Sequence, residues 1–422
     1  MAVTNPRTAR LRDDAIPAMA DLLVADGVPE PITTAFATFG VEVTAATARQ
    51  ITWWPGRSLT VRFGTVLGGP AGGDHDVVAT TGEIPDGAVV VEAADQRVGV
   101  WTVPHDPALP GLAPALDASV AAGLLADLGV SDATPRPRLR AYRPGRRAVV
   151  EVTTGVGPTI YLKVVRPHEA ERLHRHHRSL PVGLPVPESL GVDPDRGIVV
   201  LQAMPGRTLR SVLDDPGGDL PDPGAVDGLL TRLPQPLDGA VARSPIDRLG
   251  GLVALLGRIL PEEADRVGEI VAGIGPDDAP ADVPSHGDFY ESQLLVHGGV
   301  VTGLLDVDTY GLGRPADDPA TMIGHLASWQ RSSAARPERV GEFAGLLLRR
   351  WDARLDPVDL RRRAAAVVVG LATGPFRVQQ ATWPEDVGTR LAIAERWLES
   401  ARRVGEKGLI GATGPSHPRP AS

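Results

Sequence analysis

The stretch His286-Gly-Asp-Phe-Tyr-Glu-Ser-Gln-Leu-Leu-Val, followed by Val301-Thr-Gly-Leu-Leu-Asp-Val-Asp-Thr-Tyr-Gly, carries the strongest functional pattern of the chain. The carboxylate of Asp288 begins a turn, the amide of Gln293 opens a strand five positions later, and Asp306 ends the paired strand 18 positions after Asp288. Phosphoryl transfer needs one carboxylate to orient or deprotonate the acceptor hydroxyl, and an amide oxygen with a second carboxylate to hold Mg²⁺. The spacing therefore predicts a phosphoryl-transfer site, whereas His-x-Asp by itself would indicate a turn in which Asp caps its neighbours.

A lysine upstream supports the same interpretation. Among the 43 Lys and Arg residues, only Lys163 and Lys407 are lysines, so the chain uses arginine almost everywhere else. Lys163 lies in the middle of Thr159-Ile-Tyr-Leu-Lys-Val-Val, a predicted strand, where a compact ammonium group can reach phosphate oxygens.

The segment around Lys163 predicts a small antiparallel sheet with one inserted helix. Residues 139–153 form two strands around the turn Pro144-Gly145, residues 159–165 a third, and residues 197–204 a further strand that ends before Pro205-Gly206. The pattern between these strands is helical from His168 to Leu180. Its histidines, His174, His176 and His177, alternate with arginines and are interpreted as a solvated helix face.

The N-terminal part contains a weak internal repeat of this lobe. Trp53-Trp-Pro-Gly-Arg resembles Tyr142-Arg-Pro-Gly-Arg, and residues 98–104 align with residues 160–166, which places Trp101 at the position of Lys163. We therefore expect residues 1–130 to form an α/β cap, a degenerate copy of the small lobe without its lysine. Two unrelated hairpins that share a Pro-Gly turn are the alternative.

These patterns predict an α+β fold with four parts. After the cap come the small lobe, residues 131–205, and a mainly helical lobe, residues 206–410, that holds the strand-rich stretch 293–308. Residues 411–422 have no apolar periodicity and are expected to be a disordered tail.

Composition excludes several classes of function. The net charge of −9 offers no basic surface for nucleic acid, and no apolar segment indicates a signal peptide or a membrane role. With no cysteine there are no disulfides and no thiolate chemistry. We expect a cytoplasmic protein whose partner is a small molecule with a hydroxyl group; the sequence does not indicate an oligomeric state.

The stretch His286-Gly-Asp288 through Gln293 to Leu305-Asp306 resembles the catalytic and metal loops of aminoglycoside-phosphotransferase-like kinases. This resemblance covers residues 139–330 and implies a bilobal protein-kinase-like fold, with ATP and Mg²⁺ as cofactors; GTP is not excluded. It implies a catalytic loop with Asp288 as base beside His286, and Gln293 and Asp306 as magnesium ligands. In the nucleotide site it implies Lys163 on the α- and β-phosphates, Glu171 as the lysine's helix partner, Arg146 in the phosphate-covering turn, and backbone groups of the linker Gln202-Ala-Met204 against the base. It also implies that Asp317 and Asp318 brace the catalytic loop, while Asp308 is interpreted as structural.

The acceptor remains open between several alternatives. Glutamine at position 293, in place of the family's usual Asn, and the N-terminal cap resemble maltokinase- and glucosamine-kinase-like members, whereas residues 305–315 look closer to antibiotic kinases. The acidic stretch 261–284 is either a site for a cationic aminoglycoside or amino sugar, or an ordinary solvated surface. The single glycine of the phosphate-covering turn keeps a third alternative, an inactive pseudokinase that binds nucleotide.

Overall fold

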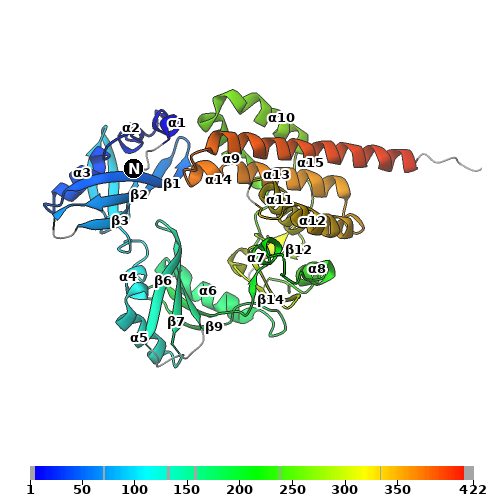
Figure 1. The fold of residues 1–422 in the computed structure, drawn as a ribbon, viewed down its shortest axis with the longest axis horizontal. Helices are drawn as coiled ribbons and strands as arrows, with labels where there is room; N and C mark the ends of the chain where they lie inside the picture. Colours follow the sequence, from blue (N-terminus) through cyan, green and yellow to red (C-terminus); the bar gives the residue numbers. More distant parts are fainter. Residues whose placement is uncertain are drawn as a thin grey trace, which may run out of the picture.

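The computed structural model describes residues 5–69, 72–130, 134–155, 159–236, 239–332 and 334–412. It has an α+β fold with antiparallel sheets and a large helical part, as the sequence predicts (Figure 1). The expected tail lies outside the described residues, except that residues 411 and 412 belong to the last helix.

The first lobe consists of three short helices and a five-stranded antiparallel sheet in the order β1-β2-β3-β5-β4. Its elements are α1 (Pro6–Ala9), α2 (Met19–Leu22), α3 (Glu30–Ala37), β1 (Val43–Trp54), β2 (Ser58–Leu67), β3 (Gly73–Thr80), β4 (Val89–Ala93) and β5 (Gln96–Thr102).

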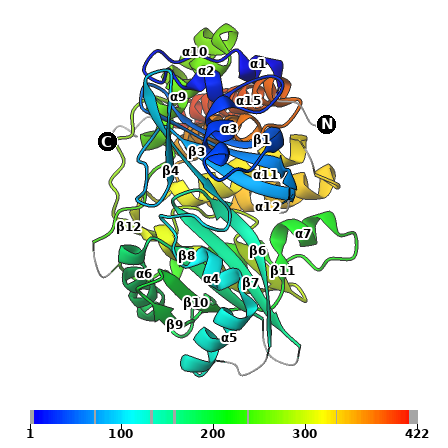
Figure 2. The same cartoon turned by 90° about the vertical axis from the view of Figure 1, so that its left-hand side faces the viewer.

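The second lobe has the same strand order, β6-β7-β8-β10-β9, with one helix inserted between β8 and β9. Its elements are α4 (Leu112–Leu116), α5 (Ala118–Asp127), β6 (Pro135–Arg143), β7 (Arg147–Thr154), β8 (Ile160–Val165), α6 (Pro167–Ser179), β9 (Ser189–Asp193) and β10 (Ile198–Gln202). Figure 2 shows the two sheets one above the other on the same side of the molecule.

The pairing register corrects the expected alignment of the two lobes. With the turns Pro55-Gly56 and Pro144-Gly145 superposed, Val149 corresponds to Thr60; Val149 pairs with Lys163 and Thr60 pairs with Thr80. Thr80 on β3, rather than Trp101 on β5, therefore stands where Lys163 stands.

Two buried aspartates anchor the two hairpins in the same way. Asp13 Oδ2 accepts hydrogen bonds from Trp53 Nε1 (3.1 Å) and the Gly56 N–H (2.7 Å). Asp106 Oδ2 accepts them from the Tyr142 hydroxyl (2.8 Å) and the Gly145 N–H (2.7 Å). Both glycines have positive φ, which suits the turn that presents the N–H to the carboxylate.

The sequence around these aspartates repeats as well. Residues 13–20 read Asp-Asp-Ala-Ile-Pro-Ala-Met-Ala and residues 106–113 read Asp-Pro-Ala-Leu-Pro-Gly-Leu-Ala, and both stretches enter a short helix, α2 or α4. Leu112 and Ala115 of α4 and Leu125 of α5 belong to one hydrophobic cluster with the second sheet, and this cluster also includes Val78 and Trp101 of the first sheet. The two helices therefore pack at the junction of the two sheets.

The helical lobe contains the strands that carry the functional motif. Its elements are β11 (Arg207–Thr208), α7 (Leu209–Asp214), α8 (Pro223–Thr231), the 3-10 turn Ile246–Arg248, α9 (Leu249–Ile259), the 3-10 turn Pro261–Glu263, α10 (Ala264–Ile274), β12 (Val283–Ser285), β13 (Leu294–His297), β14 (Val300–Leu304), the 3-10 turn Val307–Thr309, β15 (Gly311–Gly313), α11 (Asp317–Ser332), α12 (Pro337–Asp352), α13 (Pro357–Ala372), α14 (Gly374–Arg377) and α15 (Trp383–Ala412).

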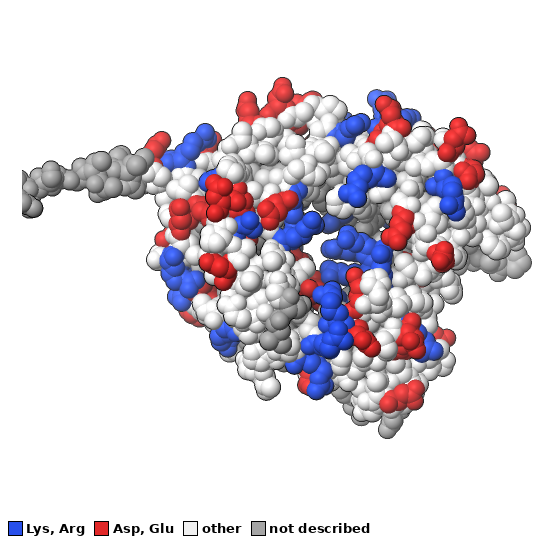
Figure 3. Space-filling view, turned by 180° about the vertical axis from the view of Figure 1, so that it is seen from behind, with Lys and Arg blue, Asp and Glu red and all other residues white. Residues whose placement is uncertain are grey.

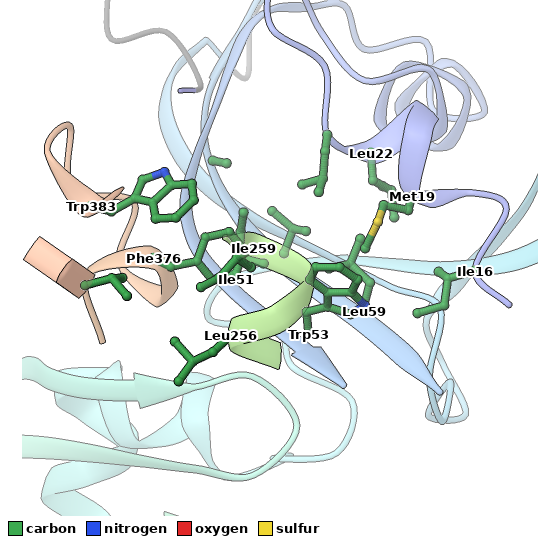
Figure 4. Close-up of a cluster of buried hydrophobic side chains, with 14 of the residues drawn as sticks. Ile16, Met19, Leu22, Ile51, Trp53, Leu59, Leu256, Ile259, Phe376 and Trp383 are labelled. Atoms are coloured by element: carbon green, nitrogen blue, oxygen red, sulfur yellow. The ribbon is translucent and has the colours of Figure 1, made fainter. Parts of the chain in front are cut away.

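The first lobe shares its hydrophobic core with the C-terminal helices. Figure 4 shows Ile51 of β1 beside Ile259 of α9, on the side of the cluster that faces Phe376 of α14. The first lobe is therefore fixed to the far end of the chain and forms one wall of the molecule. In the described part of the chain, no helix is long and apolar enough to span a membrane.

Asp106→Ala should destabilise the second lobe by about 1–3 kcal/mol, because the Tyr142 hydroxyl and the Gly145 N–H lose their buried acceptor. Asp13→Ala should act in the same way on the first lobe. Denaturant unfolding followed by circular dichroism measures both, with Asp127→Ala, an exposed position, as the control. An unchanged midpoint for both variants would contradict the anchoring role.

Candidate active site

Lys163 joins the second lobe to the helical lobe. It lies on β8 between Val149 of β7 and Val199 of β10, and its side chain is only 6% exposed. Its Nζ donates to Asp306 Oδ1 at 2.8 Å and also contacts Asp308 Oδ2. Burial alone would raise the pKa of both carboxyl groups, but the charge of Lys163 holds each pKa below its usual range.

A second cation bridges the same two carboxylates. Arg147 Nη2 lies 3.1 Å from Asp306 Oδ2, and its Nη1 lies 3.5 Å from Asp308 Oδ2. Asp306 has φ 55° and ψ 48°, a left-handed conformation that Asp tolerates better than most residues. The chain therefore leaves β14 in a turn from which both carboxylates reach Lys163.

The catalytic loop is held by a buried carboxylate beneath it. Asp318 at the start of α11 accepts the backbone N–H groups of His286 (2.6 Å) and Gly287 (2.9 Å). Burial raises the pKa of Asp318 to about 6 despite these two donors. The neighbouring Asp317 binds Ser244 and Arg363 instead, so only the second of the two aspartates braces the loop directly.

His286 links the catalytic loop to the metal loop. Its Nε2 is 2.8 Å from the Leu305 carbonyl oxygen and therefore donates, which leaves Nδ1 to accept the Asp288 N–H at 3.3 Å. The residue is fully buried. Both ring nitrogens are therefore engaged within the protein, and His286 holds the backbone of Asp288 against the metal loop.

Asp288 and the two expected metal ligands lie close together. Gln293 directly precedes β13, and its backbone carbonyl oxygen accepts the Leu305 N–H at 2.8 Å. Gln293 and Asp306 therefore lie at the same end of the β13–β14 hairpin. Burial and the charge of Asp306 raise the pKa of Asp288. An amide and a carboxylate at adjacent strand ends are the hard oxygen donors that suit Mg²⁺.

The expected helix partner of Lys163 lies elsewhere. Glu171 is exposed on the outer side of α6 and pairs with Arg175 at 3.4 Å. Asp308, which the sequence analysis interpreted as structural, takes its place beside Lys163. No local sequence pattern indicates that Asp308 pairs with Lys163, because the two residues are 145 positions apart.

The histidines of α6 are not a solvated face. His177 is buried, its Nδ1 lies 2.9 Å from the Pro187 carbonyl oxygen, and its Nε2 lies 3.9 Å from Asp308 Oδ1. His176 Nε2 is 3.0 Å from the Val307 carbonyl oxygen. The interpretation as a solvated face was therefore wrong: these side chains fasten α6 to the metal loop.

The remaining predicted positions lie at the edge of the site. Arg146 is exposed in the β6–β7 turn, whereas its neighbour Arg147 points inward to the carboxylates. Gln202 ends β10 and Met204 follows it in the segment between the two lobes. Thr302 Oγ1 donates to the Pro205 carbonyl oxygen at 2.5 Å and so ties this linker to β14.

Comparison with known proteins identifies the family. The model of the phosphotransferase enzyme family matches residues 138–366, which is more than half of the chain. The chain belongs to this family and is a phosphotransferase. No curated protein matches it.

Solved structures that match the chain include three phosphotransferases, each with a TM-score below 0.5. Aminoglycoside phosphotransferase APH(4)-Ia with ADP and hygromycin B has a TM-score of 0.48 at 14% identity, over 67% of this chain and 98% of that one. The streptomycin–ATP complex of APH(2")-IIa has 0.43 at 15% identity, over 67% and 98%. Macrolide 2'-phosphotransferase type I has 0.42 at 18% identity, over 66% and 98%.

Asp318→Asn should change how stability depends on pH. Because the pKa of Asp318 in the folded protein, about 6, lies above the ordinary value of 3.8, its proton-linked stabilisation is complete below pH 3.8 and is lost as pH rises through 6. The Asn variant lacks this titration. The free energy of unfolding of wild type relative to the variant should therefore fall by about 3 kcal/mol between pH 3.8 and 7.

Denaturant unfolding at several pH values measures this difference. Asp127→Asn, an exposed position, is the matched control and should leave the pH dependence as it is in wild type. Parallel curves for wild type and Asp318→Asn would show that Asp318 has an ordinary pKa.

Proposed function

We propose that this phosphotransferase transfers the γ-phosphoryl group of ATP, with Mg²⁺, to a hydroxyl group of a small sugar-containing molecule. The observation that carries the proposal is the 2.8 Å contact between Lys163 Nζ and Asp306 Oδ1. It joins the β8 lysine to the metal loop, which His286 links to the catalytic loop that presents Asp288 and Gln293. These are the groups that phosphoryl transfer requires.

Two cationic side chains, Lys163 and Arg147, would bind the nucleotide phosphates. Lys163 and Arg147 both point into the space between the second lobe and the metal loop, where they bind Asp306. Phosphate oxygens offer them stronger, multiply charged acceptors than the carboxylates do. We infer that both side chains exchange part of their contact with Asp306 for phosphate when nucleotide binds.

The metal would be held by Gln293 and Asp306. When bound, Mg²⁺ supplies neutralisation of the phosphate charge that develops during transfer. Asp306 keeps a pKa below its usual range and so presents a charged carboxylate at neutral pH.

Asp288 would receive the proton of the acceptor hydroxyl. Its raised pKa brings its proton affinity closer to working pH, which favours a base that accepts a proton during the reaction. The hydrogen bond from its backbone N–H to His286 and the contacts of Asp318 to the loop fix the position of the carboxylate. Catalysis then rests on positioning and electrostatics, without a covalent intermediate.

Asp288→Asn should lower acceptor-stimulated ADP release by about 10²–10⁴-fold, because the amide cannot take the proton. ATP affinity should stay within about threefold of wild type, since Asp288 faces the acceptor. ADP release over a panel of amino sugars, maltose, aminoglycosides and macrolides measures the first value, and calorimetry with ATP measures the second. Full activity in the variant would refute the assigned base, and nucleotide binding without any turnover in wild type would favour a pseudokinase.

Asp308→Asn should raise the KM for ATP about tenfold or more, because Lys163 loses one of the two carboxylates that hold its ammonium group in place. Glu171→Gln is the matched control: its carboxylate is exposed and bound only to Arg175, so the KM should not change. A larger rise in the KM for ATP in Glu171→Gln than in Asp308→Asn would instead identify Glu171 as the partner of Lys163.

A further inference from the structure

The turn between β6 and β7, which is expected to cover the nucleotide phosphates, is held from outside its own lobe. In this turn Gly145 donates its backbone N–H to Asp106 Oδ2 at 2.7 Å, and the Tyr142 hydroxyl donates to the same oxygen at 2.8 Å. The indole N–H of Trp101 donates to the Tyr142 hydroxyl oxygen at 3.1 Å. Since Trp101 belongs to β5, a relay of hydrogen bonds runs from the first lobe to the turn of the second.

The three side chains of this Trp101–Tyr142–Asp106 relay are buried. They are 7%, 6% and 2% exposed, respectively. Water therefore has little access to these hydrogen bonds, and loss of one partner leaves a buried polar atom unsatisfied. The second oxygen of Asp106 accepts the Ala108 N–H at 2.9 Å, so both oxygens of the carboxylate are engaged.

The equivalent hairpin of the first lobe is held within its own lobe. There Trp53 of β1 stands in the place of Tyr142, and its indole N–H donates directly to Asp13 at 3.1 Å. An indole N–H only donates, whereas a phenol hydroxyl donates one hydrogen bond and accepts others. The tyrosine at position 142 can therefore bind Asp106 and accept Trp101 at the same time, which connects the two lobes.

A cation of the first lobe packs on the same tyrosine. The Cζ atom of Arg62, on β2, lies 5.6 Å from the centroid of the Tyr142 ring. Its Nε donates to Asp76 of β3 at 3.1 Å, which fixes the guanidinium group in the first lobe. This cation–π contact is a second link between the first lobe and the hairpin that carries the turn.

Gly145 is fixed through both of its backbone groups. Its N–H is bound to Asp106, and its carbonyl oxygen accepts Arg166 Nε at 2.9 Å. Two residues after Gly145, Arg147 begins β7 and binds Asp306 of the metal loop at 3.1 Å. The position of the turn therefore also determines where Arg147 enters the site.

The first lobe provides a fixed support for the relay, because it shares its hydrophobic core with the helical lobe. Figure 3 shows a hollow edged by Lys and Arg side chains in the middle of the molecule, where the three lobes meet. The second lobe is therefore joined to the helical lobe directly, through Lys163 and Asp306, and indirectly, through Trp101 and the first lobe.

We propose that the first lobe positions the phosphate-covering turn: Trp101, acting through Tyr142 and Asp106, holds Gly145 so that the turn and Arg147 are in place for the nucleotide phosphates. Trp101, Tyr142 and Asp106 are positioning residues. This inference rests on the proposed function and assigns a task in it to the first lobe. A turn that is ordered before binding does not have to be ordered by the nucleotide, so the relay raises nucleotide affinity.

Trp101→Phe and Tyr142→Phe test the relay, because each variant removes one hydrogen-bonding group and keeps an aromatic ring. Calorimetry of the full chain with Mg²⁺ measures the binding of two probes, AMP-PNP and adenosine. The dissociation constant of AMP-PNP should rise at least about threefold in each variant, since a buried hydrogen bond is lost. That of adenosine, which has no phosphate, should stay within about twofold of wild type, because the turn covers phosphates only.

Trp53→Phe is the matched control. It removes the same indole N–H from a buried aspartate, Asp13, in the hairpin of the first lobe, which is not part of the relay. Denaturant unfolding should show a loss of stability in this variant, whereas its dissociation constant for AMP-PNP should stay within about twofold of wild type.

Three results would overturn the inference. Unchanged AMP-PNP affinity in both relay variants would show that the turn does not need the relay. An equal loss of adenosine affinity would indicate a general distortion of the site, and an equal loss of AMP-PNP affinity in Trp53→Phe would indicate a general loosening of the first lobe. Each leaves the proposed function standing, because that depends on Lys163, Asp288 and nucleotide binding. Failure of AMP-PNP to bind to wild type would instead reject the proposed function.

Discussion

The structure depends on a cluster of two cations and two carboxylates, in which Lys163 is buried and Arg147, Asp306 and Asp308 are partly buried. Desolvation of these charges costs several kcal/mol per ion, and only close opposite charges offset it. The second lobe supplies both cations and the metal loop supplies both carboxylates, so the cluster forms only when the lobes are correctly placed. It therefore fixes the geometry of the site, and the charges that hold the lobes together are those that a nucleotide would bind.

The chain contains two lobes that share one sheet topology but differ in what their side chains contact. Both have the same strand order and an aspartate that holds the Pro-Gly turn. The lobe with Lys163 packs α6 against the metal loop, whereas its counterpart has Thr80 at that position and a loop in place of the helix. The first lobe instead packs Ile51 of β1 into one hydrophobic cluster with Ile259 of α9 and Phe376 of α14. A repeat therefore serves as a wall of the molecule.

Short-range patterns could be predicted from the sequence, and long-range partners could not. Asp288, Gln293 and Asp306 follow from spacing within one hairpin, and Lys163 stands out because lysine is rare in this chain. A pair between Glu171 and Lys163 would need Glu171 on the inward face of α6, but Glu171 is exposed beside Arg175. The buried residues of that helix are Ala170, Leu173 and His177. The packing of α4 and α5 at the junction of the two sheets likewise depends on long-range contacts that the sequence pattern does not show. A search for Asp-x-Ala-Ile/Leu-Pro, rather than for the turns alone, would have found the repeat and its start.

Net charge describes the whole surface and says little about a single site. The chain carries −9, yet acidic residues of the outer helices are bound in pairs such as Glu263–Arg266. At Asp288, burial and the charge of Asp306 raise the pKa of the carboxyl group, while His286, Arg248 and Arg143 lower it. The groups nearest to Asp288 therefore set its proton affinity, and the net charge of the chain does not.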